Sequence, residues 1–129
     1  SGWKGTVGKI GKATVQAMER EYGTNPEDLI VTIGPSICQD CYEVSEDVIE
    51  QFQKAFPREQ WDGLFYRKEN GKYQLDLWEA NRQIFLEARV KPENISMPNL
   101  CTCCNPQFLF SHRASKGKRG NLAAFLALK

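Results

Sequence analysis

Helical and strand-like hydrophobic patterns alternate along this chain, and the alternation is the feature that most restricts its fold. Apolar residues recur at helical spacing in three stretches, 7–22, 46–56 and 77–88. A short β-branched run, 29–33, predicts a buried strand that ends at Gly34-Pro35. Segments 65–67 and 72–75 flank Asn70-Gly71, which predicts a hairpin. The sequence therefore predicts an α/β fold in which helices are layered on a sheet.

The predicted helices carry the end signals that helices of globular proteins show. Typical cap and stop residues stand at Gly23, at Ser45 followed by Glu46 and Asp47, at Pro57 and at Asp76. Inside the first helix, Gly8 and Gly11 each cost about 1 kcal/mol relative to alanine. We expect these two glycines to allow close packing against a neighbouring element.

Length and composition indicate one ordinary globular domain. The 129 residues contain 41% apolar and 26% charged residues, and no repeat or linker divides residues 1–129. A net charge of +1 argues against a dedicated nucleic-acid binder, and no apolar run is long enough to cross a membrane. The last residues predict a Cys-rich loop, a strand at 108–110, a basic turn and an apolar run from Leu122 to Leu128.

Five cysteines stand in two groups, Cys38-x-x-Cys41 and Cys101-x-Cys103-Cys104. Four thiolates from two short loops could hold structural zinc, but we interpret only the first group as having the spacing that zinc prefers. The favoured interpretation is therefore small, partly buried thiols that line a shared loop region. An odd cysteine count and the lack of a leader favour reduced thiols and a cytoplasmic protein.

A basic segment near the end of the chain suits an anionic ligand. Its cations are Arg113, Lys116, Lys118 and Arg119, and it also contains Gly117 and Gly120. Arginine binds phosphate or carboxylate through two N–H groups, and glycine lets the backbone come close. A solvated basic turn is an equal alternative. The helix start at Trp3–Thr6 could also bind an anion, although an ordinary helix start is favoured.

His112 is the only histidine of the chain. A pair with the adjacent Ser111 is excluded on a strand, because neighbouring strand residues face opposite ways. A pair with Cys103 or Cys104 stays open, and a surface histidine on a strand is favoured.

Several segments together resemble the YfiH/YlmD laccase-domain family, in family order and over nearly the whole chain. The segments are Gly2-Trp3-Lys4-Gly5-Thr6, Ile33-Gly34-Pro35-Ser36-Ile37, Cys41-Tyr42-Glu43-Val44, Leu75-Asp76-Leu77, Cys101-Thr102, and Phe110-Ser111-His112-Arg113 followed by Gly120. Members of this family are described as polyphenol oxidases, as purine nucleoside phosphorylases with adenosine deaminase activity, and as peptidoglycan editing factors. Asn121 and Cys38 depart from the family pattern, which often has arginine and glycine there.

The resemblance implies a mixed α/β sheet built from both halves of a longer chain, of which this chain is the carboxy-terminal half. It also implies that the family's metal ligands, two histidines and a cysteine, lie before Ser1. We therefore expect no metal and no activity in this chain alone, and expect zinc or copper in the full-length protein. The missing half is the implied partner, and the chain without it should expose apolar surface.

For the full-length protein the resemblance implies a purine nucleoside and phosphate as substrates. Arg113 is then the first candidate for binding phosphate, followed by Lys4 and the backbone at Gly5. Tyr42, Thr102 and Ser111 are candidates for orienting the sugar or the base. The alternatives are copper-dependent phenol oxidation, editing of cell-wall precursors, and a non-enzymatic module that binds zinc through cysteines.

Overall fold

The computed structural model describes residues 1–118 and 120–127, and confirms a mixed α/β chain. Arg119 of the basic turn and Leu128 of the apolar run lie outside the described residues. The helices are α1 Trp3–Val7, α2 Ile10–Tyr22, α3 Glu46–Ala55, α4 Trp61–Leu64 and α5 Leu77–Glu87. The strands are β1 Val31–Thr32, β2 Glu43–Val44, β3 Phe65–Arg67, β4 Tyr73–Leu75 and β5 Ile95–Ser96.

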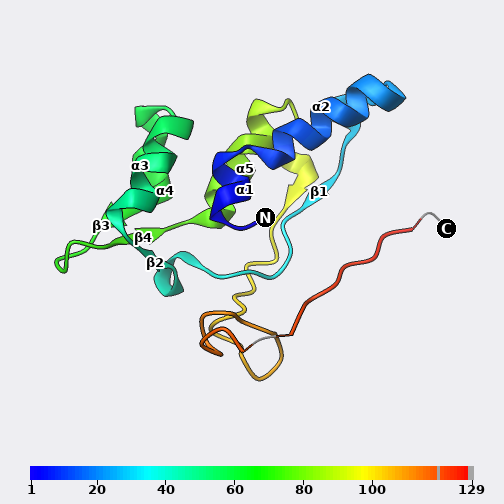
Figure 1. The fold of residues 1–129 in the computed structure, drawn as a ribbon. Helices are drawn as coiled ribbons and strands as arrows, with labels where there is room; N and C mark the ends of the chain where they lie inside the picture. The colour runs from blue at the N-terminus through cyan, green and yellow to red at the C-terminus, as the bar shows by residue number, and fades with distance from the viewer. Residues whose placement is uncertain (119, 128–129) are drawn as a thin grey trace.

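The described strands form two small sheets. β1 pairs with β5 in parallel, and β2, β4 and β3 form an antiparallel sheet in that order. In Figure 1, α1, α2 and α5 gather near the parallel pair, whereas α3 and α4 lie on the side of the antiparallel sheet. α1 and α5 connect the two groups, because α1 contacts α2, α3 and α5, and α5 contacts α2 and α4.

The predicted hairpin and the predicted cap at Asp76 are confirmed, whereas the side chain of Ser45 does not cap α3. β3 and β4 pair with Phe65 opposite Leu75, and Gly71 adopts a φ of 80° in their connection. Asp76 caps α5 by accepting a hydrogen bond from the Glu79 N–H at 2.9 Å. Ser45 stands at the start of α3, but its hydroxyl donates to the Asp47 carboxylate instead of accepting a main-chain N–H.

The first predicted helix is divided in two. Gly8 ends α1, and Lys9 adopts a left-handed φ of 51° before α2 begins. Gly11 confirms the expected close packing, since a Cβ there would lie 2.9 Å from the Phe85 ring of α5. The same expectation is wrong for Gly8, where a Cβ would meet only the Lys4 and Gly5 carbonyl oxygens of α1.

Two strand predictions are wrong. The run 29–33 is no buried strand, because only Val31 and Thr32 pair and Ile30 is 82% exposed. Residues 108–110 form no strand, and the main-chain N–H groups of Phe108 and Leu109 instead both donate to the Asn105 carbonyl. In both cases β-branched or aromatic character alone led to the prediction, and of β1 Val31 is half-buried and Thr32 exposed.

The main core lies between α3, α5 and the antiparallel sheet. Its large, fully buried side chains are Ile49, Phe52, Leu64, Leu75 and Ile84, and the Phe52 ring stacks on Phe56. A smaller cluster of Val15, Ala88 and Val90 joins α2 to the segment after α5.

The described end of the chain runs away from the helices and sheets (Figure 1). Residues 121–127 have no regular structure, and Phe125 is 96% exposed. None of the helices in the described part of the chain is long and apolar enough to cross a bilayer.

Candidate functional site

Two loops far apart in sequence meet beside the antiparallel sheet. The loop after β1 and the loop after β5 form a parallel bridge between Ser36 and Cys101. Ser36 N–H donates to the Leu100 carbonyl at 3.2 Å, and Thr102 N–H donates to the Ser36 carbonyl at 3.2 Å. These loops make one unit that supplies both a cleft wall and a cluster of thiols.

A cleft of about 690 Å³ lies between this unit, the amino-terminal residues and the segment 110–122. Four of the predicted site residues line it, namely Tyr42, Thr102, Ser111 and Arg113. Trp3, Ser36, Ile37 and Leu77 line the same cleft. The structure thus brings together hydroxyl groups, aromatic rings and one guanidinium group from five segments of the chain.

Arg113 is held at the border of this cleft by Tyr42 and Glu43. Its guanidinium carbon lies 5.4 Å from the centroid of the Tyr42 ring, and its Nη1 donates to the Glu43 carbonyl at 3.2 Å. An arginine has five N–H donors, so this bond leaves donors for an anion. Burial raises the pKa of the Tyr42 hydroxyl, and the positive charge of Arg113 offsets part of that rise. Tyr42 is therefore a neutral hydrogen-bond donor at neutral pH.

A second hollow of about 340 Å³ borders the same pair. Trp3, Tyr42 and Arg113 line both hollows, and Glu43 and Lys72 line the second. Hydrogen bonds from Lys68 and Asn70 lower the pKa of Glu43 to about 2. Its carboxylate is therefore engaged with cations and keeps its charge across the physiological pH range.

Ser111 and Thr102 are both buried polar residues of the cleft. The Ser111 hydroxyl accepts the Ala114 N–H at 3.2 Å, and Ser115 N–H donates to the Ser111 carbonyl at 3.0 Å. These bonds begin a turn that closes where Gly117 N–H donates to the His112 carbonyl at 2.8 Å. His112 is exposed in this turn and not on a strand, so the predicted strand placement is wrong.

The structure does not bring Lys4 and Gly5 to the cleft wall. The Lys4 ammonium lies 5.7 Å from the centroid of the Trp3 ring. Gly5 faces Ser1, since a Cβ on Gly5 would lie 2.9 Å from the Ser1 Cβ. That Lys4 and the backbone at Gly5 bind phosphate stays a prediction.

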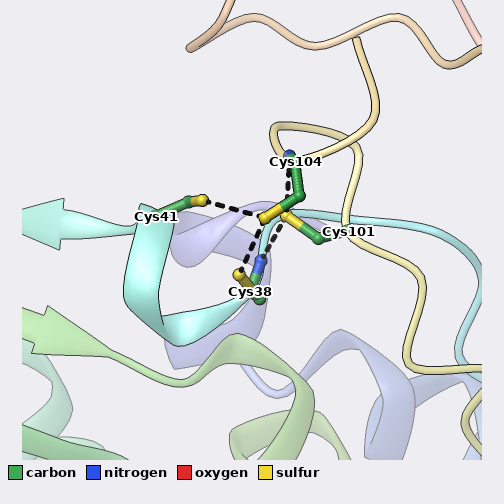
Figure 2. A group of neighbouring side chains, drawn as sticks. All are labelled: Cys38, Cys41, Cys101 and Cys104. Carbon is green, nitrogen blue, oxygen red and sulfur yellow. Dashed lines mark hydrogen bonds between the residues drawn. The ribbon is translucent and has the colours of Figure 1, made fainter. Parts of the chain in front are cut away.

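Four of the five cysteines converge on one point (Figure 2). The sulfurs of Cys38, Cys41, Cys101 and Cys104 all lie within 4.8 Å of one another. Cys104 Sγ lies 3.4 Å from Cys41 Sγ and 3.9 Å from Cys38 Sγ. All are free thiols, and their group could hold a metal ion.

Hydrogen bonds to sulfur organise this cluster. The Cys101 thiol accepts the main-chain N–H groups of Cys38 at 3.3 Å and of Cys104 at 3.4 Å. Burial raises the pKa of Cys101, but these two N–H groups, together with hydrogen bonds from the Cys38 and Cys104 thiols, lower it to about 7. A hydrogen bond with Cys104 raises the pKa of Cys41. Without a cation the group thus favours one thiolate, at Cys101.

The interpretation of the second cysteine group needs a correction. Cys101 and Cys104 are three residues apart, so they form a second Cys-x-x-Cys pair, and Cys103 is not part of the cluster. The spacing was visible in the sequence, but with three cysteines among residues 101–104 it did not show which two belong together.

The family is established by comparison with known proteins. Residues 1–129 match the family described as multi-copper polyphenol oxidoreductase laccase, and the chain belongs to this family. Its relatives include "Purine nucleoside phosphorylase YlmD" of Bacillus subtilis (strain 168), 38% identical over 129 residues. That match covers 100% of this chain and 46% of the relative.

Two further relatives also match most of this chain with less than half of their own length. "Adenosine deaminase RL5" of an unknown prokaryotic organism is 40% identical over 113 residues, which are 88% of this chain and 42% of that protein. The crystal structure of YlmD from Geobacillus stearothermophilus matches with a TM-score of 0.86 and 36% identity. The match covers 93% of this chain and 44% of that structure. The chain thus spans less than half the length of these relatives.

Proposed function

We propose that this chain forms the carboxy-terminal part of a purine nucleoside phosphorylase. The observation that carries the proposal is the cleft in which Arg113, stacked over Tyr42, stands beside the buried hydroxyl residues Thr102 and Ser111. Relatives named as purine nucleoside phosphorylases support the substrate class. Exposed apolar side chains such as Ile30 and Phe125 support a further part of the protein that packs on this one.

The proposed reaction joins phosphate to the ribose of a purine nucleoside. A phosphate oxygen attacks C1′, the bond between C1′ and the purine nitrogen breaks, and the base leaves after taking up a proton. Arg113 would bind phosphate through N–H groups that the Glu43 carbonyl does not use. Tyr42 and Thr102 would hydrogen-bond the sugar or the base, and Trp3 would contact the purine ring.

Metal chemistry in the complete protein is a separate part of the proposal. The resemblance assigns zinc to two histidines and a cysteine, which this chain cannot supply because His112 is its only histidine. The role proposed for the chain's own cleft residues is to bind and orient the two substrates. Five free thiols suit the reducing cytoplasm, where we place the protein.

Deamination of adenosine is the second candidate, favoured by the relative named as an adenosine deaminase. The test is product analysis of the complete protein with adenosine or inosine, with and without phosphate. Phosphorolysis predicts free purine base and ribose 1-phosphate only when phosphate is present. Ammonia release without phosphate would favour deamination, and neither product would contradict both activities.

A further inference from the structure

We propose that Cys38, Cys41, Cys101 and Cys104 bind one structural zinc ion that fastens the two loops of the cleft wall to each other. The site is distinct from the cleft itself and does not depend on the proposed enzymatic function. It rests on the geometry of the four sulfurs, on the two turns that carry them and on the way both turns are anchored.

The two sulfur–sulfur distances at Cys104 are close to those of a tetrahedral thiolate site, and all four sulfurs lie within 4.8 Å of one another. A zinc–sulfur bond of about 2.3 Å gives tetrahedral edges of about 3.8 Å between sulfurs. The two distances from Cys104, 3.4 Å to Cys41 and 3.9 Å to Cys38, differ from that edge by a few tenths of an ångström. A disulfide needs about 2.05 Å and joins only two sulfurs, so it does not account for the meeting of four.

Each Cys-x-x-Cys pair lies on a turn that directs both of its thiols to one side. Cys38 precedes the 3₁₀ turn Gln39–Cys41, and residues three apart eclipse each other in such a turn. The second pair lies on a turn that Asn105 Nδ2 fastens by donating to the Cys101 carbonyl at 2.8 Å. Two preformed pairs of this spacing are the usual ligand pattern of structural zinc.

The surroundings of the sulfurs fit a metal-bound state. The Cys38 and Cys104 N–H groups point at Cys101 Sγ, and such N–H···S bonds spread the negative charge of metal-bound thiolates. Cys101 is buried, whereas Cys104 is exposed, so a metal can enter from the Cys104 side. Tetrahedral sites of four sulfurs select zinc or iron, and we commit to zinc because a closed set of four ligands is typical of structural zinc.

The ion would connect elements that shape the cleft. The first turn is fixed to β4, because Gln74 Nε2 donates to the Asp40 carbonyl at 2.7 Å and Leu75 N–H to the Tyr42 carbonyl at 3.1 Å. The second turn follows β5 and provides Thr102. Zinc would therefore fix the position of Thr102 relative to Tyr42, and its loss would loosen the cleft without removing any residue that lines it.

The test is the zinc content of the complete protein and of three cysteine variants, measured by elemental analysis. Cys41→Ser and Cys104→Ser should each contain one zinc per chain less than the wild type. Cys103→Ser is the matched control, since Cys103 neighbours the cluster without joining it, and it should keep the wild-type content. Equal zinc in all four proteins would overturn the proposal, as would iron in place of zinc.

A second measurement tests the site if the Cys41→Ser and Cys104→Ser variants fail to fold. The wild-type protein is loaded with cobalt, and four thiolates predict the strong sulfur-to-cobalt charge-transfer and tetrahedral ligand-field absorption of such sites. Cys103→Ser should show the same spectrum. Absence of these bands from both proteins, or an intact mass lower by two hydrogens that shows a disulfide among the four cysteines, would refute the zinc site.

Discussion

The guanidinium carbon of Arg113 lies 5.4 Å from the centroid of the Tyr42 ring, and both residues line the cleft and the neighbouring hollow. The bond from Arg113 Nη1 to the Glu43 carbonyl fixes the guanidinium group against this ring. The local sequence Cys41-Tyr42-Glu43 thus supplies both contacts, although Arg113 lies about seventy residues further along the chain.

Loss of the Tyr42 ring should weaken phosphate binding without abolishing it. A cation–π contact at an exposed site contributes about 0.5–1 kcal/mol, which corresponds to a change of about 2- to 5-fold in an equilibrium constant. We expect Tyr42→Leu to raise the KM for phosphate by that factor, and Tyr42→Phe to raise it less. Steady-state kinetics of the complete protein measures both values. Equal KM values for Tyr42→Leu and the wild type would show that the stack does not position Arg113.

Gly11 should tolerate no large side chain, because of its contact with α5. A Cβ there would lie 2.9 Å from the Phe85 ring, and overpacking of this kind costs about 1–3 kcal/mol. We expect Gly11→Val to lower the free energy of unfolding by that amount in urea denaturation. Ala13→Val, at an exposed position of α2, introduces the same side chain and should change stability by less than 1 kcal/mol. A similar loss in both variants would mean that helix propensity and not packing is responsible.

Two glycines should respond in opposite ways to alanine. Gly71 has a φ of 80°, so Gly71→Ala should lose about 1–2 kcal/mol of stability. Gly63 lies in α4 with no atom within 4 Å of an added Cβ, so Gly63→Ala should gain up to about 1 kcal/mol. Urea denaturation compares the two, and stabilisation by Gly71→Ala would contradict the backbone geometry of the hairpin.

Glu43 should make stability depend on pH under acidic conditions. Hydrogen bonds from Lys68 and Asn70 lower its pKa from 4.5 to about 2. The folded state therefore stabilises the deprotonated carboxylate relative to the unfolded state. The contribution is present above pH 4.5 and is lost as the pH falls through about 2. We expect Glu43→Gln to flatten the dependence of Tm on pH in this range, and Lys68→Met to do the same. If Tm depended on pH as steeply in both variants as in the wild type, the pair of Glu43 and Lys68 would not be the origin of this dependence.

Local signals in the sequence predicted much of the fold. Asp76 caps α5, Gly23 ends α2 in a left-handed conformation and Gly71 turns the hairpin, because each of these features depends on neighbouring residues. The run 29–33 and the residues 108–110 were predicted wrongly, because β-branched or aromatic character alone does not determine what packs on a segment.

The candidate site was predictable in part. The resemblance named Tyr42, Thr102, Ser111 and Arg113, and the structure places all four at one cleft. The cysteines were predicted to line a shared loop region, but a metal site among them was not favoured, because the approach of Cys38 to Cys104 depends on the bridge between Ser36 and Cys101, sixty-odd residues apart. Such a pairing of distant loops leaves no periodic pattern in the sequence.

The central claim is that Arg113 binds phosphate in the cleft, and the KM for phosphate of the complete protein tests it most directly. A charge-assisted hydrogen bond contributes about 1.5–3 kcal/mol, so Arg113→Ala should raise this KM by about 10- to 100-fold. Arg20→Ala is the control, since Arg20 pairs with Glu21 on α2 and does not line the cleft. A KM for phosphate that is the same in Arg113→Ala, Arg20→Ala and the wild type would contradict the account.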